Sequence, residues 1–128
     1  KAEAFLRDSS LKDLRNDIVD LLVLLTKGNT RELLEFENKI VTYKDKKEEI
    51  LNILASFIRD IIIYKEIDEV TGLINGDKIE SIKKIAIEMS YKKLNNIIDK
   101  IGEARKSFQS NSNFQLTIRV MLIGFMEV

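Results

Sequence analysis

The sequence predicts an all-α fold, a single bundle of about six helices that occupies residues 1–128. Apolar residues recur at spacings of three and four over nearly the whole chain, and this period places them on one face of an α-helix. Helix start and stop signals separate the periodic segments, with no long linker or low-complexity tract between them. A chain of 128 residues is long enough for one hydrophobic core and too short for two.

Capping residues indicate the first two helices. Ser10–Asp13 has the sequence SLKD, a capping box in which a hydroxyl and a carboxylate three residues later satisfy free backbone N–H groups. We therefore expect a helix to follow this box and to end at Gly28. Asn29 and Glu32 repeat the start signal and predict a second, shorter helix. The apolar positions of the two helices are Leu14, Ile18, Leu21, Leu22, Leu25, Leu33, Phe36, Ile40 and Tyr43.

The longest helix is expected from about Asp45 to Ile67. Its stretch FIRDIIIY has high β-propensity, but the spacing of three and four continues well beyond the length of a strand and favours a helix. Gly72 and Gly76 bracket a loop after it. Two apolar stripes on one helix predict burial on two sides. The stripes are Ile50, Leu54, Phe57, Ile61 and Tyr64, and Leu51, Ile58 and Ile62.

Two more helices are expected after this loop. Asp77 is the predicted N-cap of the first, with Glu80 at its third helical position. Ser90 is the predicted N-cap of the second, and Asn111 can adopt the left-handed conformation that ends it. The apolar positions of these helices are Ile79, Ile82, Ala86, Met89, Tyr91, Leu94, Ile98, Ile101 and Phe108.

The last helix is apolar in nearly every direction around its axis, whereas a surface helix needs only one apolar stripe. Ser112 and Gln115 form a capping box at its start. It is either a central core helix or a helix that partly contacts another subunit, because large apolar patches usually mark partners. Gly124 favours the close approach of another backbone in both cases. The apolar residues are Phe114, Leu116, Ile118, Val120, Met121, Leu122, Ile123, Phe125 and Met126.

Composition excludes most enzyme mechanisms. The chain has no Cys and no His, so thiolate or imidazole metal sites and Cys or Ser/His nucleophiles are absent. We expect no catalytic residue, no metal site and no cofactor. The 21 basic residues equal the 21 acidic residues, so no net positive field holds phosphates. The longest apolar runs are far shorter than the ~20 residues that span a bilayer, and we expect a soluble chain with no membrane contact.

Three stretches resemble the carboxy-terminal domain of the delta prime subunit of the bacterial DNA polymerase III clamp loader. SFIRDIIIYK (Ser56 to Lys65) is similar to that family's long-helix motif, and LINGDKIE (Leu73 to Glu80) to its Asn-x-Asp entrance to the next helix. EARKSFQSNSNFQLTIRVMLI (Glu103 to Ile123) is similar to its closing helices and the turn between them. The resemblance covers nearly all 128 residues, and KAEAFL fits a point inside the family's first collar helix.

The resemblance implies a cytoplasmic collar module in DNA replication. Five clamp-loader subunits assemble through a ring of such domains, the collar, and the expected partners are the collar domains of gamma/tau and delta. The chain would be a carboxy-terminal fragment of a longer subunit whose AAA+ part, with the ATPase sites, the clamp contacts and the arginine finger, is absent. It would be part of a DNA-directed DNA polymerase holoenzyme without being an enzyme itself. No direct nucleic-acid contact is expected from it.

The candidate interface residues lie in the last helix and the turn before it. Asn111 and Asn113 are also typical turn and cap residues, and together they favour delta prime over gamma/tau. Arg119 stands where the family usually has Glu, a charge reversal that puts any contact of that Glu in doubt. Arg59 and Asp60 are expected to form a structural ion pair with neighbouring helices. The interface candidates are Asn111, Asn113, Phe114, Leu116, Arg119, Leu122 and Phe125.

Three other interpretations stay open at this point. The chain could be a gamma/tau collar domain, which has a similar long helix and closing helix. It could also be a free-standing helical module that binds a ligand or regulates another protein. A nucleic-acid-binding bundle would use the basic residues of the fourth and fifth helices, which are interleaved with acids. Those residues are Lys83, Lys84, Lys92, Lys93, Lys100, Arg105 and Lys106.

Overall fold

The computed structural model describes the backbone of residues 2–127 and the side chains of residues 10–127. Over these residues the fold is an all-α bundle of six helices, as predicted, with two short 3₁₀ turns. The helices are α1 (Ala2–Lys27), α2 (Thr30–Val41), α3 (Lys47–Ile67), α4 (Ile79–Glu88), α5 (Tyr91–Gln109) and α6 (Phe114–Phe125). The 3₁₀ turns, η1 (Lys44–Lys46) and η2 (Gly76–Lys78), precede α3 and α4.

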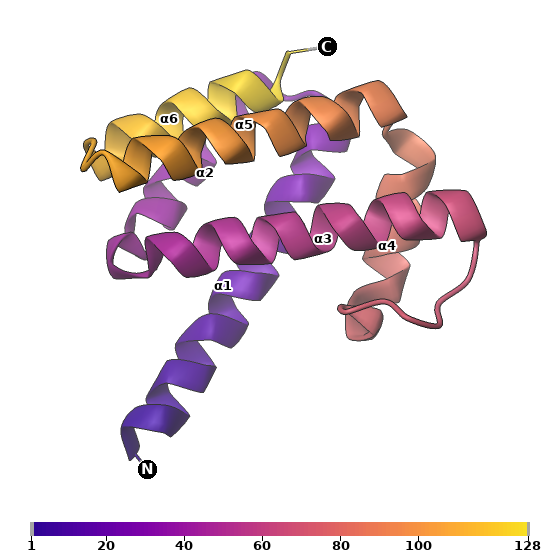
Figure 1. The fold of residues 1–128 in the computed structure, drawn as a ribbon, viewed down its shortest axis with the longest axis horizontal. Coiled ribbons are helices and arrows are strands. Elements are labelled where there is room, and N and C mark those ends of the chain that lie inside the picture. Colours follow the sequence, from indigo (N-terminus) through magenta and orange to yellow (C-terminus); the bar gives the residue numbers. More distant parts are fainter. Residues whose placement is uncertain (1, 128) are drawn as a thin grey trace.

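Helix α3 is the central element of the bundle. It packs against α1, α4 and α5, and α1 crosses behind it in Figure 1. Both predicted apolar stripes of α3 contribute to the core, and Leu51, Leu54 and Ile58 are fully buried. Burial of α3 on two sides is therefore confirmed. Helix α6 lies beside α5 at the edge of the bundle and packs mainly against α5 and α2.

Side-chain caps set several helix boundaries where the sequence predicts them. The Asn29 side chain accepts a hydrogen bond from the Glu32 N–H at 3.0 Å and starts α2. The Ser90 hydroxyl accepts from the Lys93 N–H at 3.1 Å and starts α5. Asn111 has the expected positive φ of 59° after α5. Short polar side chains form hydrogen bonds with the nearby backbone, and these bonds offset part of the free-energy cost of the non-helical conformations.

The predicted start of the first helix is wrong. Helix α1 begins at Ala2 and continues through Ser10, so the SLKD stretch lies inside the helix. Ala, Glu, Leu and Arg upstream of this stretch all favour a helix, and a capping box sets a start only if the preceding residues leave the helix. At 26 residues α1, rather than the 21-residue α3, is the longest described helix. Helix α3 itself starts at Lys47, after η1, and not at Asp45.

Two further predicted caps are also wrong. Helix α4 begins at Ile79 with no side-chain cap, and Glu80 is its second residue. Asp77 lies in η2, where its carboxylate binds Arg15 and so cannot cap the helix. At the start of α6 the side chain that accepts the Leu116 N–H is Asn113 rather than Ser112, at 2.9 Å. The first error arises because Asp77 pairs with Arg15 of another helix, and the second because Asn113 takes the role predicted for Ser112.

The loop between α3 and α4 is held by a carboxylate inside the protein. Asp60 on α3 is fully buried. Its two oxygens accept the backbone N–H groups of Ile74 at 3.0 Å and Asn75 at 2.6 Å, and one of them also accepts the Asn75 side-chain amide at 3.0 Å. Arg59 donates to the same carboxylate at 3.2 Å. Arg59 therefore pairs with its sequence neighbour Asp60. The predicted ion pair of Arg59 with a neighbouring helix is wrong.

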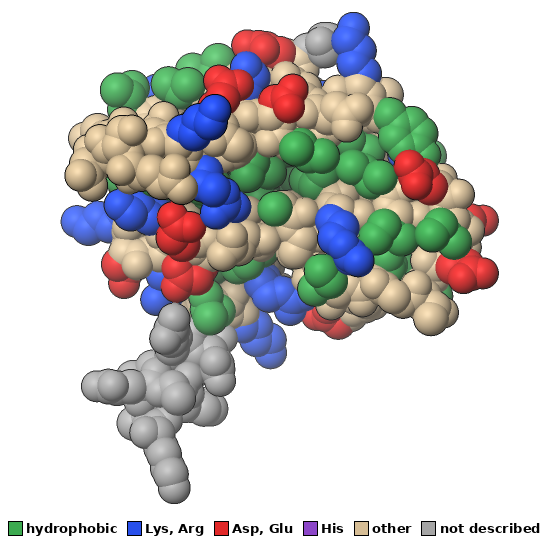
Figure 2. Space-filling view, in the orientation of Figure 1, with side chains coloured by type: hydrophobic (Ala, Val, Ile, Leu, Met, Phe, Trp, Pro, Cys, Tyr) green, Lys and Arg blue, Asp and Glu red, His purple; other side chains and the backbone are tan. Residues whose placement is uncertain are grey.

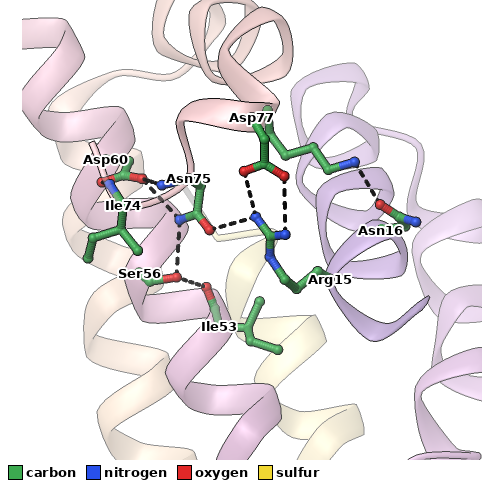
Figure 3. A network of polar contacts seen from close by, with 9 residues as sticks. Arg15, Asn16, Ile53, Ser56, Asp60, Ile74, Asn75 and Asp77 are labelled. Atoms are coloured by element: carbon green, nitrogen blue, oxygen red, sulfur yellow. Dashed lines mark hydrogen bonds and ion pairs between the residues drawn. The ribbon is translucent and has the colours of Figure 1, made fainter. Parts of the chain in front are cut away.

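The same network continues to the first helix (Figure 3). The Asn75 side chain donates to the Ser56 hydroxyl at 3.2 Å and accepts from Arg15 of α1 at 3.0 Å. Arg15 also pairs with both oxygens of Asp77, at 3.2 and 3.0 Å, and holds the pKa of Asp77 below its usual value through this bond. The two separate stretches SFIRD and LINGD thus form one structural unit that joins α1, α3 and the loop.

Replacing Asp60 by Ala should destabilise the domain by about 3 kcal/mol, because three N–H donors would lose their acceptor in a buried place. The loss of stability in Asp60→Asn should lie between zero and that in Asp60→Ala, since an amide can accept at only one of its two terminal atoms. Urea unfolding followed by circular dichroism measures both.

The matched control is Arg59→Ala, which removes a half-exposed partner of the same carboxylate. It should cost below about 1 kcal/mol. Equal effects of Asp60→Ala and Arg59→Ala would contradict the account of the loop.

Candidate interaction surface

Helix α6 has two different apolar sides. Its inner side is part of the core, and Ile118, Leu122 and Phe125 have no exposed surface. Its outer side carries three apolar residues that water reaches: Leu116 is 57% exposed, Val120 59% and Ile123 46%. The prediction of a central core helix is therefore wrong, because only the inner side of α6 is covered, and contact of this helix with another subunit stays a prediction. The helix is a core element on one side and has an uncovered apolar stripe on the other.

A groove runs beside this stripe, between α5 and α6. Its volume is about 350 Å³. Leu116, Val120 and Ile123 line it from α6, and Ala104 and Ser107 from α5. Hydrophobic side chains are visible along α6 at the upper edge of Figure 2. We call the outer stripe of α6 and this groove the α5/α6 surface.

The predicted interface residues are divided between core and surface. Leu122 and Phe125 fill the domain's own core and present no atoms to a partner in this arrangement. Phe114 is partly buried and stacks on Phe108 of α5, with ring centroids 5.6 Å apart. Leu116 is exposed on the α5/α6 surface. Of the four predicted apolar candidates, Leu116 is thus the one whose surface is mostly exposed.

The two asparagines before α6 are exposed and serve the turn. Asn111 takes the left-handed conformation and Asn113 caps α6, through its side chain to the Leu116 N–H and its carbonyl to Thr117. Val120 and Ile123 were not selected from the sequence as interface candidates. Their spacing with Leu116, at i, i+4 and i+7, is the signal that identifies one helix face.

Arg119 forms an ion pair within the chain. Its guanidinium donates to both carboxylate oxygens of Glu37 on α2, at 2.9 and 3.0 Å. Gln115 donates to the same carboxylate at 3.0 Å. Glu37 is buried, and the hydrogen bond from Arg119, followed by that from Gln115, lowers its pKa against the opposing effect of burial. The positive charge at position 119 therefore neutralises Glu37 and holds α6 against α2.

Gly124 is approached by a side chain and not by a backbone, contrary to our expectation. A Cβ at this position would lie 2.7 Å from Cδ of Lys100 on α5. The Lys100 stem crosses Gly124, and its ammonium lies 3.4 Å from Glu103 and 3.6 Å from Glu127. These contacts raise the pKa of Lys100, with the hydrogen bond to Glu103 as the main cause. Three charged groups thus gather at the end of the groove near the carboxyl end of α6.

The carboxyl end of α6 is capped by polar side chains from α5. Lys93 donates to the backbone carbonyls of Phe125 and Glu127, and Asn96 donates to that of Gly124 at 2.8 Å. These bonds add side-chain donors at the end of the helix, where the regular pattern of backbone hydrogen bonds stops. Burial lowers the pKa of Lys93.

Several of the lysines and arginines that suggested a nucleic-acid site are engaged inside the chain. Lys93 and Lys100 have the contacts just described, and Arg105 pairs with Glu48 of α3 at 3.2 Å. They therefore do not form one free basic stripe on α4 and α5. This arrangement does not favour the nucleic-acid interpretation, because bulk phosphate binding needs uncompensated cations.

A second apolar area lies between α3 and α5. Hydrophobic side chains form a band there in the middle of the face shown in Figure 2. Ala55, Arg59, Ile98 and Ile101 line a shallow groove of about 220 Å³ at this place, and Ile98 is 43% exposed. This area and the α5/α6 surface lie on opposite sides of α5.

The described part of the chain offers few of the side-chain groups that a site for small-molecule chemistry would need. Residues 10–127 contain no group of three or more acidic side chains that could hold a metal ion. Within the same part of the chain, every buried side-chain nitrogen or oxygen has a hydrogen-bond partner. Among the described helices, none is long and apolar enough to cross a membrane.

The fold and the α5/α6 surface define a helical domain suited to contact with another protein. A family model described as the carboxy-terminal domain of the DNA polymerase III delta subunit matches residues 9–127. The chain belongs to this family, and so to the clamp-loader subunits of DNA polymerase III. The family description names the delta subunit, whereas the motifs of the sequence pointed to delta prime. Comparisons with curated proteins and with solved structures found no match.

Replacing Arg119 by Glu should destabilise the domain more than Arg119→Ala does, because a second carboxylate would face the buried Glu37. The charge swap Glu37→Arg with Arg119→Glu should recover part of the loss. A double-mutant cycle from urea unfolding at pH 7 measures the coupling.

The coupling should also depend on pH. A carboxyl pKa that is lower in the folded state than the usual 4.5 stabilises the fold above that value. The difference in stability between the original chain and Arg119→Ala should therefore be fully present at pH 7 and shrink as Glu37 becomes protonated in acid. A difference that stays constant from pH 7 to pH 3 would contradict the ion pair.

Proposed function

We propose that this domain is a collar module of the clamp loader, which holds its subunit next to the collar domains of neighbouring subunits. The observation that carries the proposal is the uncovered apolar stripe of α6, in a family whose members are clamp-loader subunits. Clusters of exposed apolar residues on an otherwise well-packed domain commonly mark partner sites. The chain acts in the cytoplasm, where chromosome replication takes place in bacteria.

The presence of two apolar areas also supports a place in a ring. Head-to-tail contacts in a ring use two different patches on each subunit. The α5/α6 surface and the α3–α5 groove lie on different sides of α5 and would serve two neighbours. A domain that only capped the end of an assembly would need one patch.

Within the clamp loader, we assign the chain to the delta prime subunit. The support is the resemblance of three stretches, including the SNSN turn with Asn111 and Asn113. The name of the matching family offers delta as the alternative, and gamma/tau has a similar collar domain. A free-standing regulatory module is the remaining alternative, and it predicts that no partner in the clamp loader binds this chain.

The collar role predicts that this chain and a gamma/tau collar fragment form a mixed species. Size-exclusion chromatography with light scattering, at moderate salt and beside each component alone, measures its mass. Val120→Asp should abolish the mixed species, because it places a charge in the middle of the α6 stripe.

The matched control is Val70→Asp, at a position that is also half exposed but lies in the loop after α3. It should leave assembly unchanged, and circular dichroism must show that both variants fold. If this chain binds neither gamma/tau nor delta nor the complete set of other subunits, the collar role is wrong.

The subunit assignment has its own test. A subunit that carries this domain should restore clamp loading on primed DNA to a complex that lacks delta prime, and not to one that lacks delta. Restoration of the second complex alone would replace delta prime by delta in the assignment. Either result leaves the collar role in place.

A further inference from the structure

We propose that the α5/α6 groove receives an amphipathic helix of the neighbouring subunit and that this helix carries a Lys or Arg at one defined end. The apolar face of the helix would pack on Leu116, Val120 and Ile123. Its basic side chain would reach Glu103 and Glu127. This inference rests on the proposed collar function and names the chemistry of the partner at that site.

The shape of the groove fits a helix. Leu116, Val120 and Ile123 lie along one line of α6, and the seven residue steps from the first to the last correspond to about 10 Å or two turns. The volume of about 350 Å³ lies between two helices that run side by side. An apolar stripe at i, i+4 and i+7 beside a groove is the usual partner of another helix with the same spacing.

The charge of the groove is uneven along its length. At the carboxyl end of α6, Lys100 is shared by Glu103 and Glu127, so two carboxylates face one ammonium. The side chains of Glu103 and Glu127 are 64% and 61% exposed, whereas that of Lys100 is 23% exposed. The charged residues that line this end of the groove therefore sum to one negative charge. Lys93, the other cation at the carboxyl end of α6, lies outside the groove lining and binds the Phe125 and Glu127 carbonyls. A cation from a partner would complete the cluster, because exposed carboxylates attract it at little desolvation cost.

The opposite end of the groove is neutral. Its lining there consists of Ser107 and Ser112 with Leu116 and Thr117. Arg119, the nearest cation on α6, is already paired with Glu37. The groove thus has an acidic end and an uncharged end, and this difference specifies the direction in which a helix with one basic end would lie.

A symmetric pair of α6 helices from two copies of this chain does not match these charges. In an antiparallel pair of α6 helices, the acidic end of one copy would face the uncharged Ser107 and Ser112 of the other. In a parallel pair, two acidic ends would meet and repel each other. Charge complementarity therefore favours a different chain with a basic residue over a homodimer.

Charge reversal tests the basic residue separately from the apolar contact. The double variant Glu103→Lys with Glu127→Lys, mixed with purified gamma/tau and delta subunits, should weaken assembly by about tenfold or more at low salt. The loss should become smaller as salt increases, because the charges are exposed. The matched control is Glu66→Lys with Glu69→Lys, two exposed acids in the last turn of α3 and in the loop after it, with the same change in net charge.

Cross-linking identifies the occupant. A photoreactive benzoylphenylalanine at position 120, in the assembled complex, should capture a helix of a neighbouring subunit that carries a Lys or Arg within about two turns of the captured residue. The same group at position 70 is the control, and it should capture none of the peptides that are captured from position 120. Mass spectrometry of the cross-linked peptides gives the result.

The outcomes separate this inference from the collar role. Assembly that tolerates both Val120→Asp and the charge reversal would overturn the groove as the site while leaving the collar role. Loss with Val120→Asp but none with the charge reversal would overturn the basic partner. A cross-link only to a second copy of this chain would overturn the choice of a different subunit. Failure of the unaltered chain to assemble would overturn the collar role itself.

Discussion

The buried carboxylate of Asp60 is the interaction on which the arrangement of the domain depends. It fixes the start of the segment that leads to α4 by accepting the N–H groups of Ile74 and Asn75. Asn75 then connects the loop to Arg15 of α1. A buried carboxylate is stable only when its oxygens are well hydrogen-bonded, so these bonds hold the loop against α3 at Ile74 and Asn75. That position places α4 against α3 and leaves α5 to return along the bundle.

The position of α6 at the edge of the bundle follows from the same arrangement. With α3 surrounded by α1, α4 and α5, the last helix can pack only on the outer side of α5 and on α2. It is held there by the Arg119–Glu37 pair and by the caps from Lys93 and Asn96. The sequence nevertheless gives it apolar residues on the outer side as well. An edge helix with two apolar sides is the physical basis for the proposed joint between subunits.

The helical class, the starts of α2 and α5 and the two-sided burial of α3 could be predicted because they depend on local periodicity and caps. The start of α1 could not, because SLKD is compatible with both a helix start and a helix interior. The hydrogen-bond partners of Asp60 were also missed, because Ile74 and Asn75 lie 14 and 15 residues further along the chain and meet Asp60 only in the tertiary structure. The same holds for Arg119, whose partner Glu37 lies 82 residues away. At the surface, periodicity identified an unusually apolar helix, but only packing distinguishes Phe125 inside from Val120 outside.

The central claim is that the outer face of α6 becomes covered when the clamp loader assembles. Hydrogen–deuterium exchange of this chain, alone and in the complex with gamma/tau and delta, tests it most directly because exchange reports protection at each peptide. The account predicts slower exchange in α6 and the adjoining part of α5, with little change in the loop at residues 68–75. Unchanged exchange in α6 within a fully assembled complex would contradict it.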